Sequence, residues 1–181
     1  MVKKLREKTE IPLVFMTYLN PVFHYGYEAF FERCQDVGID GIIIPDLPFE
    51  EKEEVDVVAS RYGIDLISMI APTSKERIRK IAKGAKGFLY VVSSMGVTGE
   101  RTNITTDIGG MLKEIRSVSS VPAAVGFGIH TPDQAAEISK TADGVIVGSA
   151  VVKLIEKYGS HAGGHLYTYV RMMKETVSHS E

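Results

Sequence analysis

The chain has 181 residues, of which 44% are hydrophobic and 24% are charged, and these proportions are typical of a soluble globular domain. Its formal net charge of −2 gives no electrostatic reason to expect a nucleic acid or an anionic membrane as a partner. No apolar run approaches the roughly 20 residues of a membrane span, and we expect no signal peptide. The single Cys34 excludes an intramolecular disulfide and fits a reducing compartment. We therefore expect one cytoplasmic domain covering residues 1–181.

Six short apolar runs, rich in β-branched residues, recur along the chain, with helical patterns between them. They cover residues 13–18, 41–44, 65–70, 88–92, 122–125 and 144–147. The runs show little alternation between apolar and polar residues, which is typical of parallel strands that are covered on both faces. Regular alternation of strands and helices predicts a parallel sheet with right-handed crossovers.

Capping residues mark the start of two of the expected helices. Thr73 and Glu76 have the spacing of a capping box. Thr131 and Gln134 form a second pair of this kind, with Pro132 at the first helical position.

Glycine-rich turns follow the last two expected strands. Gly126 and Gly128 come after the first of them, and Gly148 precedes Ser149 after the second. Glycines at such places let backbone N–H groups approach an anion, and the helix that follows adds partial positive charge. Two such turns on successive strands are what a βα-barrel uses to bind a phosphate group. Tight turns or close helix packing are the alternative for the glycines, and Ser149 is also suited to be a plain N-cap.

A doubly wound dinucleotide-binding sheet also alternates strands and helices, but it carries its glycine fingerprint in the first βα turn. The late position of the glycines here favours a (β/α)8 TIM-barrel-type fold. Such a barrel has eight strands and roughly 250 residues, so this chain is about two βα units short. We expect an incomplete barrel of six parallel strands, with the missing units on the N-terminal side.

Several segments closely resemble the tryptophan synthase α subunit, and they occur in the order found in that family. They are PLVFMTYLNP at 12–21, GIDGIIIPDLP at 38–48, IAPT at 70–73, GFLYVV at 87–92, GVTG at 96–99, GFGI at 126–129 and GSAVV at 148–152. The resemblance implies a (β/α)8 barrel that cleaves indole-3-glycerol phosphate to indole and glyceraldehyde 3-phosphate. It also implies a pyridoxal-phosphate-dependent β subunit as the partner, which joins indole to serine.

The catalytic carboxylates of that family have no counterpart in these residues. The resemblance places a catalytic glutamate on the second barrel strand and a catalytic aspartate in the loop after it, both before the region aligned with Leu13. Positioned acid–base groups typically contribute about 10²–10⁴-fold each to a proton transfer. We therefore assign no catalytic residue and predict little or no lyase activity for this chain alone.

The binding part of the site is better represented. By resemblance, the substrate phosphate contacts Gly99, Gly128, Gly148 and Ser149, and Gly126 shapes the turn between two of them. The indole pocket is lined by Tyr90, Phe127, Ile43 and Met16, with Tyr18 at its rim. Apolar side chains at strand ends are often simple core residues, and this alternative stays open for the two aromatic residues of the lining.

Three further residues have roles implied by the resemblance. Asp46 communicates with a mobile loop around Thr98 and with the β subunit, and Asn20 belongs to the surface that faces that subunit. Taken without the family, Asp46 is either a general base or a cap for a helix that begins near Phe49 or Glu50. Asn20 is alternatively a turn residue before Pro21.

Two other classes of function remain compatible with the residues alone. One is a different phosphate-binding barrel enzyme, such as a phosphoribosyl isomerase or a thiamin phosphate synthase. The other is a non-catalytic chain that binds a sugar phosphate or a β subunit. The five histidines form no metal-ligand motif, so we expect neither a metal nor a cofactor on this chain.

Overall fold

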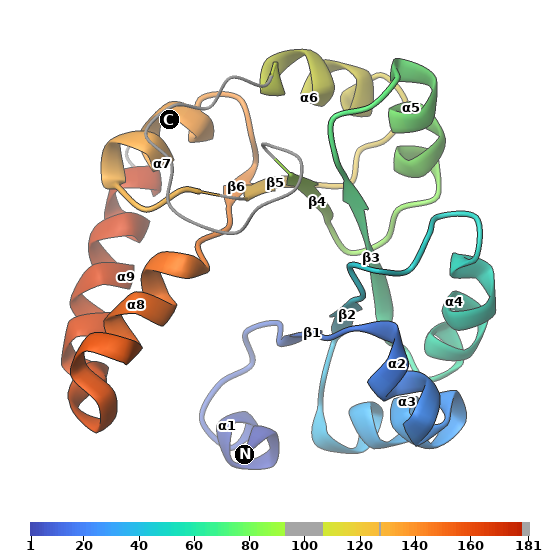
Figure 1. Cartoon of the computed structure of the whole chain (residues 1–181), viewed down its shortest axis with the longest axis horizontal. Helices are drawn as coiled ribbons and strands as arrows, with labels where there is room; N and C mark the ends of the chain where they lie inside the picture. Colours follow the sequence, from blue (N-terminus) through green and yellow to red (C-terminus); the bar gives the residue numbers. More distant parts are fainter. Residues whose placement is uncertain (93–106, 127, 179–181) are drawn as a thin grey trace. The chain divides into compact units, whose positions relative to one another are not determined.

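The computed structural model describes residues 1–92, 107–126 and 128–178 (Figure 1). Contacts divide the chain into two compact units. The first unit comprises Met1–Met69 with Gly84–Phe88, and the second comprises Ile70–Lys83 with Leu89–Glu181. The assignment of all residues to a single domain stays a prediction.

The first unit contains three parallel strands that pair in chain order, the third as far as Met69, together with the helices that connect them. The strands are β1 (Val14–Met16), β2 (Gly41–Ile43) and β3 (Asp65–Ile70). The helices are α1 (Val2–Arg6), α2 (Leu19–Tyr25), α3 (Tyr27–Val37) and α4 (Lys52–Arg61). Each strand coincides within two residues with an apolar run of the sequence.

The register of these strands decides which side chains face the helices. Phe15, Ile42 and Leu66 are paired across the sheet; Ile42 and Leu66 belong to the hydrophobic core of this unit, and the partly buried Phe15 packs against it. That core includes Phe31 and Cys34 from α3. Because successive side chains of a strand point to opposite faces, the neighbouring row of the sheet lies on the face away from these helices.

The second unit also pairs its three parallel strands in chain order. The strands are β4 (Leu89–Val92), β5 (Ala123–Gly126) and β6 (Gly144–Val145). The helical segments are α5 (Lys75–Lys83), α6 (Ile108–Arg116), α7 (Pro132–Ser139), α8 (Ser149–Tyr158), the short 3₁₀ helix η1 (Gly159–His161) and α9 (Ala162–Ser178). In Figure 1, α9 lies alongside α7 and α8, and both contacts belong to this unit.

One of the two predicted capping boxes is confirmed. The Thr131 hydroxyl accepts a hydrogen bond from the Gln134 N–H, and the Gln134 side chain accepts one from the Thr131 N–H. The other prediction is wrong by one residue, because Ser74 rather than Thr73 accepts a bond from the Arg77 N–H, at 3.3 Å. The α5 hydrogen bonds begin at the carbonyl of Ser74, so the cap falls on that residue.

Among the described residues, no helix is both long and apolar enough to cross a membrane.

Candidate functional site

The two glycine turns lie at the carboxyl ends of neighbouring parallel strands. Ala124 pairs with Gly144 and Val125 with Val145, so β5 and β6 run side by side in the same direction. Gly128 follows the end of β5, and Gly148 lies just before α8 at the end of β6. The predicted tandem arrangement is therefore present in the second unit.

Gly128 has a backbone conformation that favours glycine. Its φ of 87° lies in the left-handed region, where a side chain would be strained. Its carbonyl accepts a hydrogen bond from Nδ1 of His130, over 2.8 Å. The His130 N–H in turn donates to Oε1 of Gln134 over 3.0 Å, which ties the turn to the first residues of α7. These bonds give the turn a defined shape.

Gly148 differs from Gly128 in both conformation and surroundings. Its φ is −116°, a conformation open to any residue, and no protein atom lies within 4 Å of the position that a Cβ would take. Neither backbone conformation nor packing requires a glycine here, and the space beside it is open. Such space lets a ligand approach the backbone closely.

Ser149 is the first residue of α8, and Gly148 is the N-cap of that helix. The alternative interpretation of Ser149 as a plain N-cap is therefore wrong. Because α8 has no side-chain cap hydrogen bond, the N–H groups of its first turn are oriented toward the end of β6 without a competing side-chain acceptor. This arrangement, together with the helix dipole, is suited to an anion.

Tyr90 lies against the start of the Gly128 turn. It is 7% exposed, and its hydroxyl is 2.5 Å from the position that a Cβ would take on Gly126. Burial raises the pKa of the Tyr90 phenol above its usual value. The sequence indicated a turn-shaping role for Gly126, and the structure adds a packing reason, because only a glycine leaves room for this ring.

In the first unit, the structure brings two predicted pocket residues together. Met16 and Ile43 are paired across β1 and β2, in the row on the face away from the helices. Ile43 is buried, whereas Met16 is 56% exposed. Tyr18 is exposed at the N-cap position of α2, and Asn20 is exposed on the same helix.

Asp46 caps a helix, but not the one that the sequence suggested. Its Oδ1 accepts a hydrogen bond from the N–H of Leu19, the first residue of α2, over 2.9 Å. A cap for a helix near Phe49 is wrong, because α4 begins at Lys52 and its N-cap residue makes no side-chain cap bond. Asp46 instead joins the segment after β2 to the segment after β1, a contact that no local pattern reveals. Its coupling role stays a prediction.

Three predicted site residues lie outside the described part of the chain: Thr98, Gly99 and Phe127. The roles that the resemblance gives them stay predictions.

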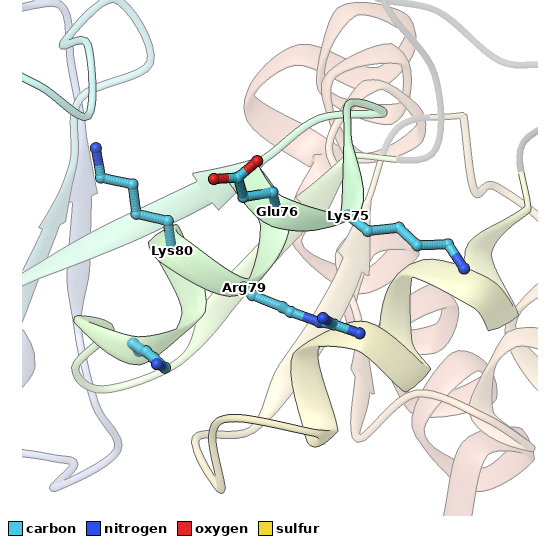
Figure 2. Close-up of a pocket in the computed structure, with 5 residues that line it drawn as sticks. Lys75, Glu76, Arg79 and Lys80 are labelled. Carbon is cyan, nitrogen blue, oxygen red and sulfur yellow. The ribbon is translucent and has the colours of Figure 1, made fainter.

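A cationic hollow on α5 is a separate feature of the second unit. It has a volume of about 560 Å³ and is lined by residues of this one helix: Lys75, Glu76, Arg79, Lys80 and Lys83. Figure 2 shows Lys75 and Arg79 extending to one side of α5 and Lys80 to the other. Lys75 and Arg79 both pair with the carboxylate of Glu114 on α6, over 3.2 and 2.6 Å. Two of the cations thus share one carboxylate, and their contacts tie α5 to α6.

Glycine turns after neighbouring parallel strands, each leading toward a helix, are typical of phosphate-binding proteins of the βα-barrel class. Comparison with known proteins specifies the class further. The family model of the tryptophan synthase alpha chain matches residues 1–178, and the chain belongs to this family. The alternative of a different phosphate-binding barrel enzyme is therefore wrong.

Similar curated proteins carry the same family name. The chain is 48% identical over 177 residues to the tryptophan synthase alpha chain of Lacticaseibacillus casei, covering 98% of this chain and 66% of the relative. It is 50% identical over 178 residues to that of Lactiplantibacillus plantarum, covering 98% and 67%. The chain thus spans about two thirds of the length of the curated relatives it matches.

Solved structures show the same fold. A tryptophan synthase alpha chain from Legionella pneumophila matches with a TM-score of 0.83 and 34% identity, covering 98% of this chain and 67% of that one. A tryptophan synthase complex from Pyrococcus furiosus matches with a TM-score of 0.86 and 32% identity, covering 96% and 70%. The predicted fold class, a TIM-barrel type represented by six parallel strands, is confirmed.

Proposed function

We propose that this chain binds the substrate of the tryptophan synthase α reaction, in which indole-3-glycerol phosphate is cleaved to indole and glyceraldehyde 3-phosphate. The observation that carries the proposal is the pair of turns at Gly128 and Gly148, in a chain that belongs to this family. We place this function in the cytoplasm, because the reaction is biosynthetic and a free thiol such as that of Cys34 is typical of a reducing compartment.

The phosphate group is bound at the ends of β5 and β6. The open space at Gly148 admits an oxygen atom close to the backbone, and the uncapped start of α8 supplies N–H groups and a positive dipole end. Ser149 adds a hydroxyl at the start of that helix. Gly99 contributes to the same site by resemblance.

The indole ring is received by apolar side chains. Tyr90 is held beside the Gly128 turn by its packing on Gly126, which fits a ring-binding surface next to the phosphate turn. By resemblance, Ile43 and Met16 also belong to the pocket: they are paired on the face of their sheet away from the helices, where Ile43 is buried and Met16 is exposed, and Tyr18 is exposed near them in sequence. Phe127 completes the pocket by resemblance.

The 181 residues bind substrate but do not turn it over. The resemblance places the family's catalytic glutamate and aspartate before the region aligned with Leu13, so the acid–base groups have no counterpart here. Loss of two groups that each contribute about 10²–10⁴-fold leaves a rate below ordinary detection. A fluorescence assay for indole release tests this point, and release at the rate of an ordinary enzyme would contradict it.

A pyridoxal-phosphate-dependent β subunit is the proposed partner. The similar structures include one that concerns mutual activation of the tryptophan synthase α2β2 complex from Pyrococcus furiosus. Asn20, on the exposed side of α2, belongs to the proposed contact surface, and Asp46 lies next to it through its bond to Leu19. Thr98 connects the site with this surface by resemblance.

The phosphate assignment is tested by titrating the chain with glycerol 3-phosphate and comparing two variants. Gly148→Val places side-chain atoms in the open space, and a Cβ there meets no protein atom within 4 Å at a φ open to any residue, so the chain should remain folded while affinity falls at least tenfold. Gly163→Ala is the matched control, because Gly163 also has nothing within 4 Å of its Cβ position but lies in α9. Equal affinity in Gly148→Val and the unchanged chain would contradict the assignment.

A further inference from the structure

A side chain of the C-terminal helix reaches the Gly128 turn. The hydroxyl of Tyr169, on α9, donates a hydrogen bond to the carbonyl of His130 over 2.9 Å, although the two residues are 39 positions apart. Helices α9 and α7 pack against each other in the second unit (Figure 1). The contact therefore joins the last helix to the segment between β5 and α7.

His130 connects the Gly128 turn to α7 and α9 by hydrogen bonds. Its ring Nδ1 carries a proton, because the Gly128 carbonyl at 2.8 Å is only an acceptor. Its N–H donates to Gln134 at the start of α7, and its carbonyl accepts from Tyr169. Ring, N–H and carbonyl of one residue are thus all engaged, and Tyr169 provides the bond from a distant segment.

We propose that Tyr169 is a positioning residue for the phosphate site, acting through His130 on the Gly128 turn; the inference rests on the proposed function of that turn. Backbone N–H groups bind an anion well only when they are oriented before it arrives. Without the Tyr169 hydroxyl, the His130 carbonyl loses its distant donor and the turn samples more conformations. Tyr169 is not placed in contact with the ligand.

The variant Tyr169→Phe isolates this role because it removes the hydroxyl and keeps the ring. Losing one hydrogen bond of ordinary strength should weaken binding at the turn about three- to tenfold. Thr168→Val is the matched control. It removes a neighbouring hydroxyl from α9, one that donates to the Gly164 carbonyl within the same helix over 3.0 Å.

The experiment is a titration of the 181-residue chain and both variants with glycerol 3-phosphate, in which nuclear magnetic resonance measures the binding. Weaker binding in Tyr169→Phe, with unchanged binding in Thr168→Val, is the expected result. Binding that is equal in all three chains would overturn the inference and leave the proposed function intact. No binding by the unchanged chain would overturn the proposed function, and the inference with it.

Amide hydrogen exchange supplies a second readout that does not depend on the ligand. The His130 N–H should exchange faster in Tyr169→Phe, while the amides in the middle of α9 keep their rates. A general loss of packing would raise both sets of rates together. Unchanged exchange at His130 in the folded variant would also overturn the inference.

Discussion

The phenol of Tyr90 occupies the space that a side chain on Gly126 would need, with its hydroxyl 2.5 Å and its Cζ 2.7 Å from the ideal Cβ position. Tyr90 lies on β4 and Gly126 ends β5, so the contact crosses two neighbouring strands. It fixes the ring beside the turn that leads to Gly128.

Gly126→Ala should therefore lower the free energy of unfolding by about 1–3 kcal/mol, the usual cost of overpacking a buried site. Urea denaturation measures this change. Tyr90→Leu removes the clashing atoms, so the double variant should be more stable than the sum of the two single effects predicts. Additive effects would show that the two residues do not share this space.

Acid should weaken the link between α5 and α6. The bonds from Lys75 and Arg79 hold the pKa of Glu114 below its usual value. A carboxylate with a lowered pKa in the folded state stabilises the protein above its unfolded pKa, about 4.3, and that contribution disappears as the pH falls through the folded pKa. Glu114→Gln should thus be less stable than the unchanged chain at pH 7, with a smaller difference below pH of about 4.

Urea titrations between neutral and acidic pH measure that difference. Glu137→Gln is the control, because the Glu137 side chain is 74% exposed in its pair with Lys140 whereas that of Glu114 is 10% exposed. The control should change stability by less than about 0.5 kcal/mol at any pH. A pH-independent effect of Glu114→Gln would contradict the ion-pair account.

The cap that Asp46 provides for α2 should be separable from any coupling role. Asp46→Ala removes the acceptor for the Leu19 N–H and should destabilise the chain by about 1 kcal/mol, whereas Asp46→Asn keeps an acceptor and should be nearly neutral. Thermal unfolding distinguishes the two variants. Equal destabilisation by both would mean that charge, not capping, is what Asp46 contributes to stability.

The open side of β1 should promote self-association. Among the strands that the structure describes, β1 pairs only with β2 and ends the strand order. The Leu13 carbonyl accepts a hydrogen bond from Asp40, and the Thr17 N–H donates one to Ile43, both on the side of β2. Because backbone groups alternate in direction along a strand, those of Val14 and Met16 point to the opposite, unpaired side. Open edges of this kind pair with other chains.

Sedimentation at increasing concentration should therefore show a dimer, and Met16→Lys should shift it toward the monomer. Val57→Lys is the control, because Val57 on α4 has the same exposed fraction as Met16, 56%. A monomer at every concentration, with or without Met16→Lys, would contradict the prediction.

Strand positions were predictable because a buried parallel strand is a local apolar run, and all six were found within two residues. The Thr131 capping box was also local. The bonds from Asp46 to Leu19, from Tyr169 to His130 and from Arg79 to Glu114 join residues 27, 39 and 35 positions apart. No pattern along the sequence encodes such pairs, because they depend on how helices and strands pack.

The candidate site divides in the same way. Gly128 and Gly148 were predictable from their position after apolar runs, but not the difference between them: the backbone conformation favours glycine at Gly128, whereas the space beside Gly148 is open. The role of Asp46 as a cap could not be predicted, because it depends on the start of α2 lying beside the segment after β2.

The central claim is that these residues bind an indole-linked phosphate without the family's catalytic carboxylates. Calorimetric titration of the 181-residue chain with a non-reactive indole-alkyl phosphate tests it most directly. The account predicts binding that is tighter than that of glycerol 3-phosphate and at least tenfold weaker in Gly148→Val. A folded chain that binds neither compound would contradict it.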